Sequence, residues 1–219
     1  MALTKFNFNS FDLTTAAGKG IAFNSSANGL ETAAEGSLTL IKTLTASSSS
    51  TLSFVDGSSS VVLDNTYPVY LFKFINCHPA TNSALLRFTA STDGGSNYGV
   101  TKTSTGVNAY NAESFAQAAI GYNTGIDLAQ STTPQNLSTN VSNASDGSTS
   151  GVFYLFNPSS TTFVKHFIVR SSLNNGSYAQ DEYFAGYLNT TSAIDAIQFK
   201  FSSGNIDAGT IKLYGIKDS

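Results

Sequence analysis

The chain has 219 residues, with 11 Lys and Arg against 14 Asp and Glu, which gives a formal net charge of −3. Charged residues make up only 11% of the sequence and form no basic cluster, so the attraction that drives nucleic-acid binding is missing and we exclude DNA and RNA as partners. A chain of this length buries roughly 70% of its unfolded surface, so no metal or cofactor is needed to hold the core, and the single cysteine, Cys77, excludes a disulfide framework.

Residues 1–36 are predicted to be an N-terminal arm or first strands, and residues 37–219 a β-sandwich domain. The opening MALTKFNFNSFDL lacks the apolar core of a secretory signal peptide, and no run approaches the roughly eighteen apolar residues of a membrane span. In an extended chain Phe6 and Phe8 would face one way, and with Phe11 they would form an arm that adds to a neighbouring subunit's sheet edge. The alternative is that this segment is the first strand of its own sandwich.

The first strands of the sandwich are predicted from hydrophobic periodicity. In LTLIKTL, Leu38, Leu40 and Lys42 occupy one face of a strand, a pattern that buries one side of a sheet. TLSFV adds a short strand. Val69–Ile75 is more continuously apolar, as expected for a strand in the middle of a sandwich.

The stretch STDGGSNY, Ser91–Tyr98, combines one acid with two glycines. Asp93 lacks the alternating oxygen ligands and closing Glu of an EF-type calcium loop, and no phosphate-binding G-K-[ST] sequence follows. Asp-Gly and Gly-Gly supply the positive φ angles of a tight turn between strands. We therefore predict a hairpin turn here and a second one in NNGSY, which ends at Tyr178.

Only Asn111–Tyr122, NAESFAQAAIGY, is predicted to be helical, with Asn111 as the N-cap and a glycine as the stop. The following Asp127–Gly151 is polar and nearly free of large apolar residues. Since Leu137 and Val141 would not suffice to bury a face, we predict a long surface loop.

Strands resume in the last third of the chain. Phe163–Val169 is more continuously apolar than an alternating strand, GTIKLYGI adds another strand, and in IQFKF the apolar Ile197, Phe199 and Phe201 alternate with polar residues. Strands at short intervals between Ser-, Gly- and Asn-rich turns predict an all-β, jelly-roll-like antiparallel β-sandwich with long polar loops.

Few residues offer reactive chemistry. His78 and His166 are the only histidines; we expect a half-buried His166, and because Cys77 and His78 would point to opposite faces of a strand, we expect no metal site or catalytic dyad there. The adjacent Asp181 and Glu182 would form a glycosidase pair only if a facing element supplied the right spacing. A solvated turn or strand end is the favoured interpretation of these two acids.

Aromatic residues gather in SYAQDEYFAGY. Exposed rings beside Asn and Asp hold sugars in many β-sandwich lectins, so Tyr178, Tyr183 and Tyr187 are candidate glycan contacts. The alternative is that half of these rings fill the core, as the aromatic content of a chain without Trp requires.

Three segments carry a resemblance. SLTLIKTLTASSSSTLSF, YLFKFINCHPATNSALLRFTASTDGGSNYGV and GNIDAGTIKLYGIK resemble parts of virion proteins from tailed bacteriophages, especially marine ones. The similarity covers roughly Ser37 to Ile216 and rests on sequence patterns of strands and turns rather than on catalytic motifs. It implies an all-β, non-enzymatic protein exposed on the particle, and it carries over no site residues.

The function expected from this resemblance is that of a structural protein on the exterior of a phage virion, of the head-decoration or tail-accessory type. A full fibre is disfavoured because the sequence has no heptads, collagen repeat or other shaft. The expected partners are other virion proteins and further copies of the chain, with a trimer as the leading oligomer and assembly in the host cytoplasm. Alternatives are a receptor-binding fibre tip that binds a host glycan and, more remotely, a polysaccharide depolymerase.

Overall fold

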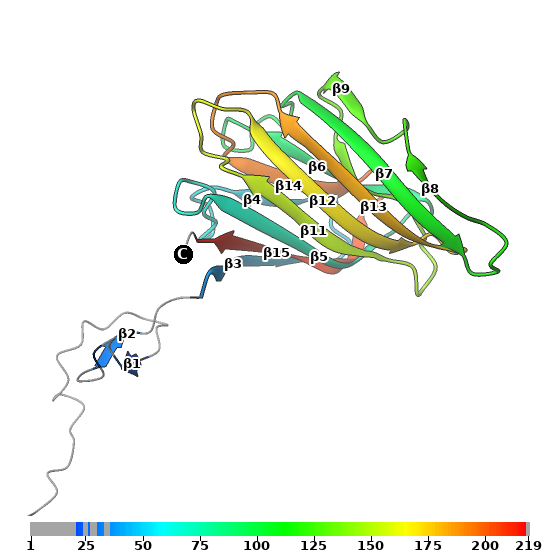
Figure 1. The fold of residues 1–219 in the computed structure, drawn as a ribbon, viewed down its shortest axis with the longest axis horizontal. Coiled ribbons are helices and arrows are strands. Elements are labelled where there is room, and N and C mark those ends of the chain that lie inside the picture. The colour runs from blue at the N-terminus through cyan, green and yellow to red at the C-terminus, as the bar shows by residue number, and fades with distance from the viewer. Residues whose placement is uncertain (1–20, 24–25, 27–29, 33–35, 218–219) are drawn as a thin grey trace, which may run out of the picture.

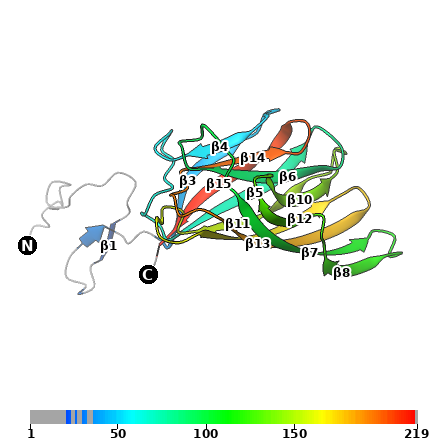
Figure 2. The ribbon, with the colours of Figure 1, turned by 90° about the horizontal axis from the view of Figure 1, so that it is seen from above.

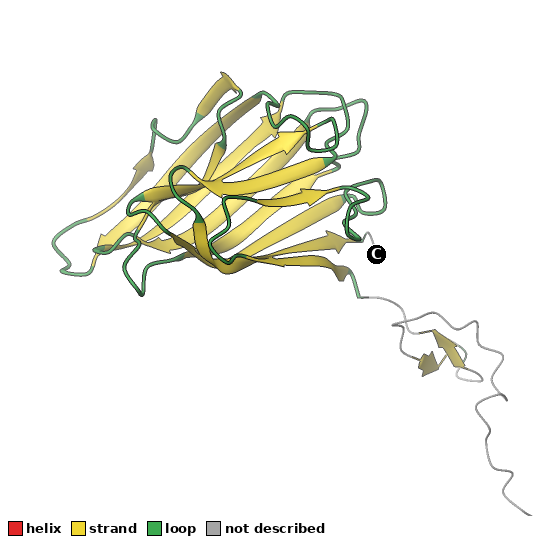
Figure 3. Ribbon diagram, turned by 180° about the vertical axis from the view of Figure 1, so that it is seen from behind, coloured by secondary structure: helices red, strands yellow, loops and turns green. Residues whose placement is uncertain are grey.

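The computed structural model describes residues 21–23, 26, 30–32 and 36–217 (Figure 1). This part of the chain consists of strands, turns and loops and contains no helix (Figure 3). The strands are β1 (Ile21–Phe23), β2 (Leu30–Thr32), β3 (Leu38–Thr45), β4 (Leu52–Val55), β5 (Val69–Pro79), β6 (Ala84–Ser91), β7 (Lys102–Ala112), β8 (Ala118–Tyr122), β9 (Leu128–Ser131), β10 (Gln135–Val141), β11 (Thr149–Phe156), β12 (Lys165–Asn174), β13 (Tyr178–Leu188), β14 (Ala196–Phe201) and β15 (Ile206–Ile216).

Two antiparallel sheets of unequal size pack face to face, which confirms the predicted β-sandwich (Figure 2). The larger sheet has nine strands, in the order β3, β15, β5, β11, β12, β13, β7 and β8, with β9 also paired to β7. The smaller sheet has four, in the order β10, β6, β14 and β4, while β1 pairs with β2 separately. At one side of the smaller sheet β10 contacts β12 and β13. The larger sheet continues beyond that edge as β7 and β8.

The core between the sheets is built on phenylalanine. The Phe153 ring is fully buried and stacks on Phe88, with ring centroids 4.4 Å apart, and on Phe72, with centroids 5.2 Å apart. Phe199 and Phe54 close the cluster edge to face, 6.0 Å apart. Burying one such side chain stabilises the fold by about 1.5–3 kcal/mol, so this cluster is the main attachment of one sheet to the other.

Several strand predictions are confirmed. Ile197, Phe199 and Phe201 all point into the core from β14, and Val69–Ile75 forms most of β5, in the interior of the larger sheet. The strand predicted at Phe163–Val169 begins two residues later, at Lys165 in β12, and the Phe163 ring is exposed.

The prediction that Leu38, Leu40 and Lys42 share one buried face is wrong. Leu38 and Leu40 are 44% and 52% exposed, and a shift of register between Leu40 and Lys42 interrupts the alternation of β3. The side chains that pack against the core from this edge strand are Ile41 and Leu44. The two outward leucines therefore lie on the outer face of the larger sheet.

The predicted helix Asn111–Tyr122 is also wrong, because this segment forms the hairpin of β7 and β8. The Ala112 amide donates to the Gln117 carbonyl at 2.8 Å, and Phe115 takes a positive φ of 57° in the turn. β13 pairs with β7 over its whole length, up to Tyr178 opposite Ala112. A helix here would have few large apolar residues to bury, whereas the extended chain gains a full ladder of backbone hydrogen bonds.

The predicted surface loop Asp127–Gly151 is wrong for most of its length. It contains β9, β10 and the start of β11, and Leu137 and Val141 are fully buried in the core. β10 is buried although most of its residues are polar, because its inward hydroxyl groups have hydrogen-bond partners. The Ser138 hydroxyl, for example, is hydrogen-bonded to the Thr149 hydroxyl. A polar strand is stable inside a sandwich once its polar groups are hydrogen-bonded.

The stretch Ser91–Tyr98 is a turn, as predicted, but it does not close a hairpin. It connects β6 of the smaller sheet to β7 of the larger one, and these two strands are not paired. The Asp93 carboxylate accepts from the Asn97 amide nitrogens and from the Ser91 hydroxyl, and these bonds, the Asn97 side chain first, lower the pKa of Asp93 to about 2. The acid stabilises its own turn. The NNGSY turn does close a hairpin, between β12 and β13.

The larger sheet has two distinct ends. At the first, which we call the terminal end, the chain enters β3 and leaves β15, and the Lys217 amide donates to the Ser37 carbonyl at 2.9 Å. At the other, the hairpin end, lie the turns from β7 to β8 and from β12 to β13 (Figure 1). Surfaces at the two ends differ in chemistry.

Candidate functional site

The outer face of the larger sheet carries apolar side chains that the sandwich leaves uncovered. Antiparallel pairing aligns them across neighbouring strands in two rows near the terminal end. We call these the apolar rows; they consist of Leu38, Ile216, Val69, Phe156 and Tyr187, with His166 between the last two, and of Leu40, Tyr214, Leu71, Tyr154, Ile168 and Ala185, of which Leu71 is only 4% exposed. An outer sheet face is usually polar where it meets water, so this composition is typical of a contact surface.

A hollow of about 580 Å³ deepens this face over β12, β13 and β7. Phe156, Ile168, Tyr187 and His166 line it, and Ile168 is 49% exposed. His166, predicted to be half-buried, is exposed, and its ring lies 6.1 Å from that of Tyr187. The hollow therefore offers mainly aromatic and aliphatic surface.

The three tyrosines predicted as glycan contacts do not form one site. Tyr183 and Tyr187 lie on the outer face, where the Arg170 guanidinium sits 4.9 Å from the Tyr183 ring centroid. Tyr178, an odd number of residues away along β13, projects from the inner face. Phe6, Phe8 and Phe11 of the predicted assembly arm lie outside the described residues.

Asp181 and Glu182 are likewise separated by the sheet. Asp181 lies on the outer face, where its carboxylate accepts from Arg170 Nε at 3.2 Å and from Arg170 Nη2 at 3.0 Å. Glu182 points inward and has no exposed surface, so the expectation of a solvated pair is wrong for it. The two carboxyl groups face opposite layers, so this pair does not flank a sugar bond as a glycosidase pair must.

Near the end of β5, Cys77 belongs to the core, whereas the neighbouring His78 is only partly buried. The thiol is fully buried, and burial raises its pKa to about 12. His78 Nδ1 lies 2.5 Å from the Gly147 carbonyl oxygen. Among the described residues no group of three or more His, Cys, Asp or Glu side chains is arranged to hold a metal ion.

Two lysines are buried at the terminal end of the inner face. Burial lowers the pKa of Lys102 to about 8, and its ammonium donates to the Val100 carbonyl at 2.7 Å. Lys165 donates to the Thr190 carbonyl at 3.1 Å. Both groups hold neighbouring loop backbone, which is a structural role.

A polar cleft opens at the hairpin end, where the larger sheet extends past β10. It encloses about 260 Å³. We call it the amide cleft, because most of its lining side chains are amides; it is lined by Asn108, Tyr110, Gln117, Asn123, Thr139, Asn140, Asn175, Tyr178 and Gln180.

Glu182 lies behind this cleft and organises it. The Thr139 backbone amide donates to Glu182 Oε2 at 2.9 Å, the Thr139 hydroxyl donates to Oε1, and Gln180 Nε2 donates to Oε1 at 2.8 Å. Despite these three donors, burial raises the pKa of Glu182 to about 7. The bonds also join β10 to β13, so one carboxyl group connects the two sheets.

Sequence reasoning missed the amide cleft, although the alternation in β13 contains its signal. Four even-numbered residues of β13 lie on its inner face: Gln180, Glu182, Phe184 and Leu188. The last two are core residues. A strand face that is apolar at one end and polar at the other indicates that the polar end lies at the border of the covered region, where the covering strand supplies hydrogen-bond partners instead of apolar side chains. The change from apolar to polar residues along β13 can be read as a cleft only when the strand that covers β13 is known.

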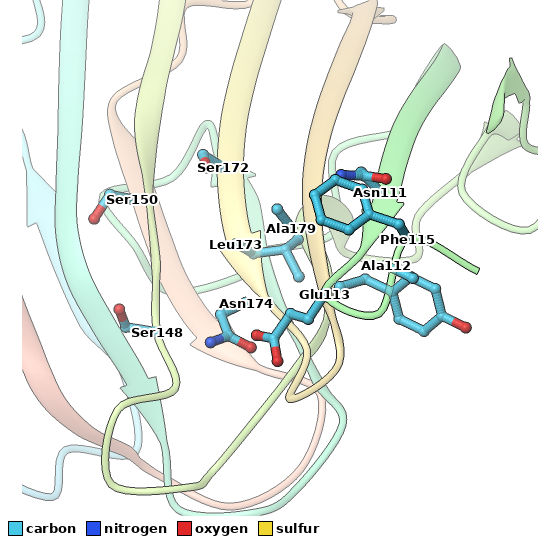
Figure 4. A pocket seen from close by; sticks show the side chains of 11 residues that line it. Asn111, Ala112, Glu113, Phe115, Ser148, Ser150, Ser172, Leu173, Asn174 and Ala179 are labelled. Atoms are coloured by element: carbon cyan, nitrogen blue, oxygen red, sulfur yellow. The ribbon is translucent and has the colours of Figure 1, made fainter. Parts of the chain in front are cut away.

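A second hollow at the hairpin end lies on the outer side of the sheet (Figure 4). It encloses about 440 Å³ between Asn111, Glu113, Ser150 and Asn174. Phe115, 85% exposed, stands at its edge. Its polar groups come from β7, β11 and β12 and from the turn after β7.

Comparisons with protein-family models, with curated proteins and with solved structures find no match to this chain. In the part of the chain that the structure describes, no helix is long and apolar enough to span a membrane.

Proposed function

We propose that the protein is a non-enzymatic structural component on the exterior of a phage virion, of the head-decoration or tail-accessory type. The observation that supports this most directly is the pair of apolar rows at the terminal end. They expose Leu38, Leu40 and Ile168 on a face that the smaller sheet does not cover. Such a surface gains free energy when a neighbouring subunit covers it, at about 25 cal/mol per Å² of apolar area.

The edge of the larger sheet supports the same role. β3 is an edge strand of eight residues with one charged side chain, Lys42, and edge strands of this kind pair readily with other chains. The aromatic arm with Phe6, Phe8 and Phe11 of a neighbouring copy would add to such an edge, its backbone giving affinity and its rings giving register. The expected assembly is a homo-oligomer, with a trimer as the first state to test by light scattering.

Particle incorporation tests the proposal. Ile168→Asp places a charge in the apolar rows, whereas Ile120→Asp makes the same change at a 77% exposed site on β8, outside them. Purified virions should contain the chain, and Ile168→Asp should reduce its copy number severalfold while Ile120→Asp leaves it unchanged. Both variants should melt within a few degrees of the wild type, because both sites are exposed.

Two results would reject this role. One is the absence of the chain from purified particles, measured by mass spectrometry. The other is equal incorporation of Ile168→Asp and wild type. Deleting residues up to Phe11 tests the arm separately: lost incorporation with an unchanged melting temperature supports docking, and an unfolded product supports a strand of its own sandwich.

A further inference from the structure

The amide cleft exists because the two sheets differ in width. β10 is the last strand of the smaller sheet on this side and packs over β12 and β13. The inner face of β7 therefore meets the cleft instead of a covering strand, with Asn108 and Tyr110 along it. The cleft lies at the hairpin end, away from the apolar rows.

Gln180 supplies a fixed hydrogen-bond acceptor. The side chain is only 8% exposed, and its Nε2 donates to Glu182 Oε1 at 2.8 Å and to Thr139 Oγ1 at 3.2 Å. Both amide hydrogens are thereby used, and the amide cannot flip without losing both bonds. Its oxygen stays in one orientation for a ligand that donates.

Two tyrosines supply aromatic surface in a fixed arrangement. The rings of Tyr110 and Tyr178 stand at 88° with centroids 5.5 Å apart, and the Tyr178 hydroxyl donates to Gln117 Oε1 at 3.1 Å. Both side chains are half-buried. Perpendicular rings of this kind present an apolar surface next to the amides without having to be ordered on binding.

The charge of the lining narrows the ligand class. All nine lining residues are neutral, and the nearest carboxyl group in the network, Glu182, is fully buried behind Thr139 and Gln180. An ionic ligand would lose hydration without gaining an opposite charge, and an apolar one would leave amides unpaired. A ligand with many hydroxyl groups and an apolar C–H face satisfies both kinds of surface.

We propose that the amide cleft binds a neutral saccharide, with sugar hydroxyls on Asn108, Asn140 and Gln180 and a C–H face of the ring on Tyr110 or Tyr178. The volume of about 260 Å³ lies below the roughly 300–1,000 Å³ of sites for drug-sized ligands, so the cleft holds a single sugar unit. This site does not depend on the proposed assembly role, and it uses neither Tyr183 nor Tyr187.

Saturation-transfer NMR on the full chain tests the proposal, with the methyl glycosides of glucose, galactose, mannose and N-acetylglucosamine as probes. Asn108→Ala removes a cleft amide, and Asn111→Ala, on the opposite face of the same strand, is its matched control. We expect transfer from at least one glycoside, with affinity reduced about fivefold by Asn108→Ala, as the loss of one hydrogen bond implies, and unchanged by Asn111→Ala.

Three outcomes would overturn the proposal: no transfer from any of the four glycosides at millimolar concentration, equal effects of the two Asn variants, or binding abolished by Tyr183→Ala, which would place the sugar on the outer face. Melting curves of the variants confirm that each is folded. Incorporation into particles should be the same for Asn108→Ala and wild type, so failure of the saccharide site and failure of the assembly role are distinguishable.

Discussion

The ionisation of Glu182 should control the stability of the sandwich near neutral pH. The side chain has no exposed surface, and burial raises the pKa of its carboxyl group from 4.5 to about 7. The folded state thus holds the proton more tightly than the unfolded state. Its contribution to stability is fully present below about pH 4.5 and is lost as the pH rises to about 7; the difference between the two pKa values corresponds to about 3 kcal/mol.

The Glu182→Gln variant keeps the shape of the side chain and removes the titration. We expect the free energy of urea unfolding of the wild type to fall by about 3 kcal/mol relative to the variant between pH 4.5 and pH 8, and the melting temperature by about 6–12 °C. Comparing the two proteins at each pH cancels the titration of other groups. A difference that stays constant over this range would refute the reasoning.

Three further experiments test the packing. Phe153→Ala should lower the free energy of urea unfolding by about 3–5 kcal/mol, because the ring is fully buried among other rings, and a loss below about 1 kcal/mol would contradict the core described here. Gly151→Ala should cost about 1–3 kcal/mol, since an added Cβ would lie 2.5 Å from the Phe74 ring, while Gly99→Ala, with nothing within 4 Å, should be neutral in the same melting assay. Cys77 should react with iodoacetamide at pH 8 only after unfolding, because it is buried and its pKa is raised to about 12; rapid labelling of the native protein would disagree.

Alternating apolar residues were sufficient to predict the strands that face the core on one side. Ile197, Phe199 and Phe201 lie where the pattern places them, because a one-residue change of register would expose all three side chains. The pattern failed at Leu38 and Leu40, where β3 is an edge strand with an interrupted register. A partner outside the chain would explain why apolar residues are kept there.

Polar strands could not be predicted, because their stability is set by partners far away in the sequence. Thr139 and Ser138 are buried in β10 because each has a hydrogen-bond partner on another strand. The Thr139 hydroxyl donates to Glu182, and the Ser138 hydroxyl is hydrogen-bonded to that of Thr149. The same cause hid the amide cleft, whose Gln180 is oriented by Thr139 from the other sheet. Composition alone makes such segments look like loops.

The hairpin of β7 and β8 shows how neighbours override local preference. Asn111–Tyr122 has a plausible N-cap and helix-forming alanines, yet Ala112 pairs with Tyr178 of β13 and the strand continues to its end. A helix would have left the last part of β13 without a partner. The pairing of one long strand therefore decides the conformation of the next, and this is information that a local pattern does not contain.

The unequal widths of the sheets connect the two proposed surfaces. A four-stranded sheet cannot cover nine strands, so the inner face beyond β10 must be polar to meet water; Asn108 and Tyr110 of β7 occupy it, and Gln180 lies at its border, where β10 still covers β13. No sheet formed by the described residues covers the outer face, yet near the terminal end it is apolar, with Leu40 and Ile168 exposed. Solvent alone would favour the opposite composition there. The inner surface is thus suited to a small polar ligand and the outer one to another protein, and because they lie at opposite ends of the sheet, both can be occupied in one assembled particle.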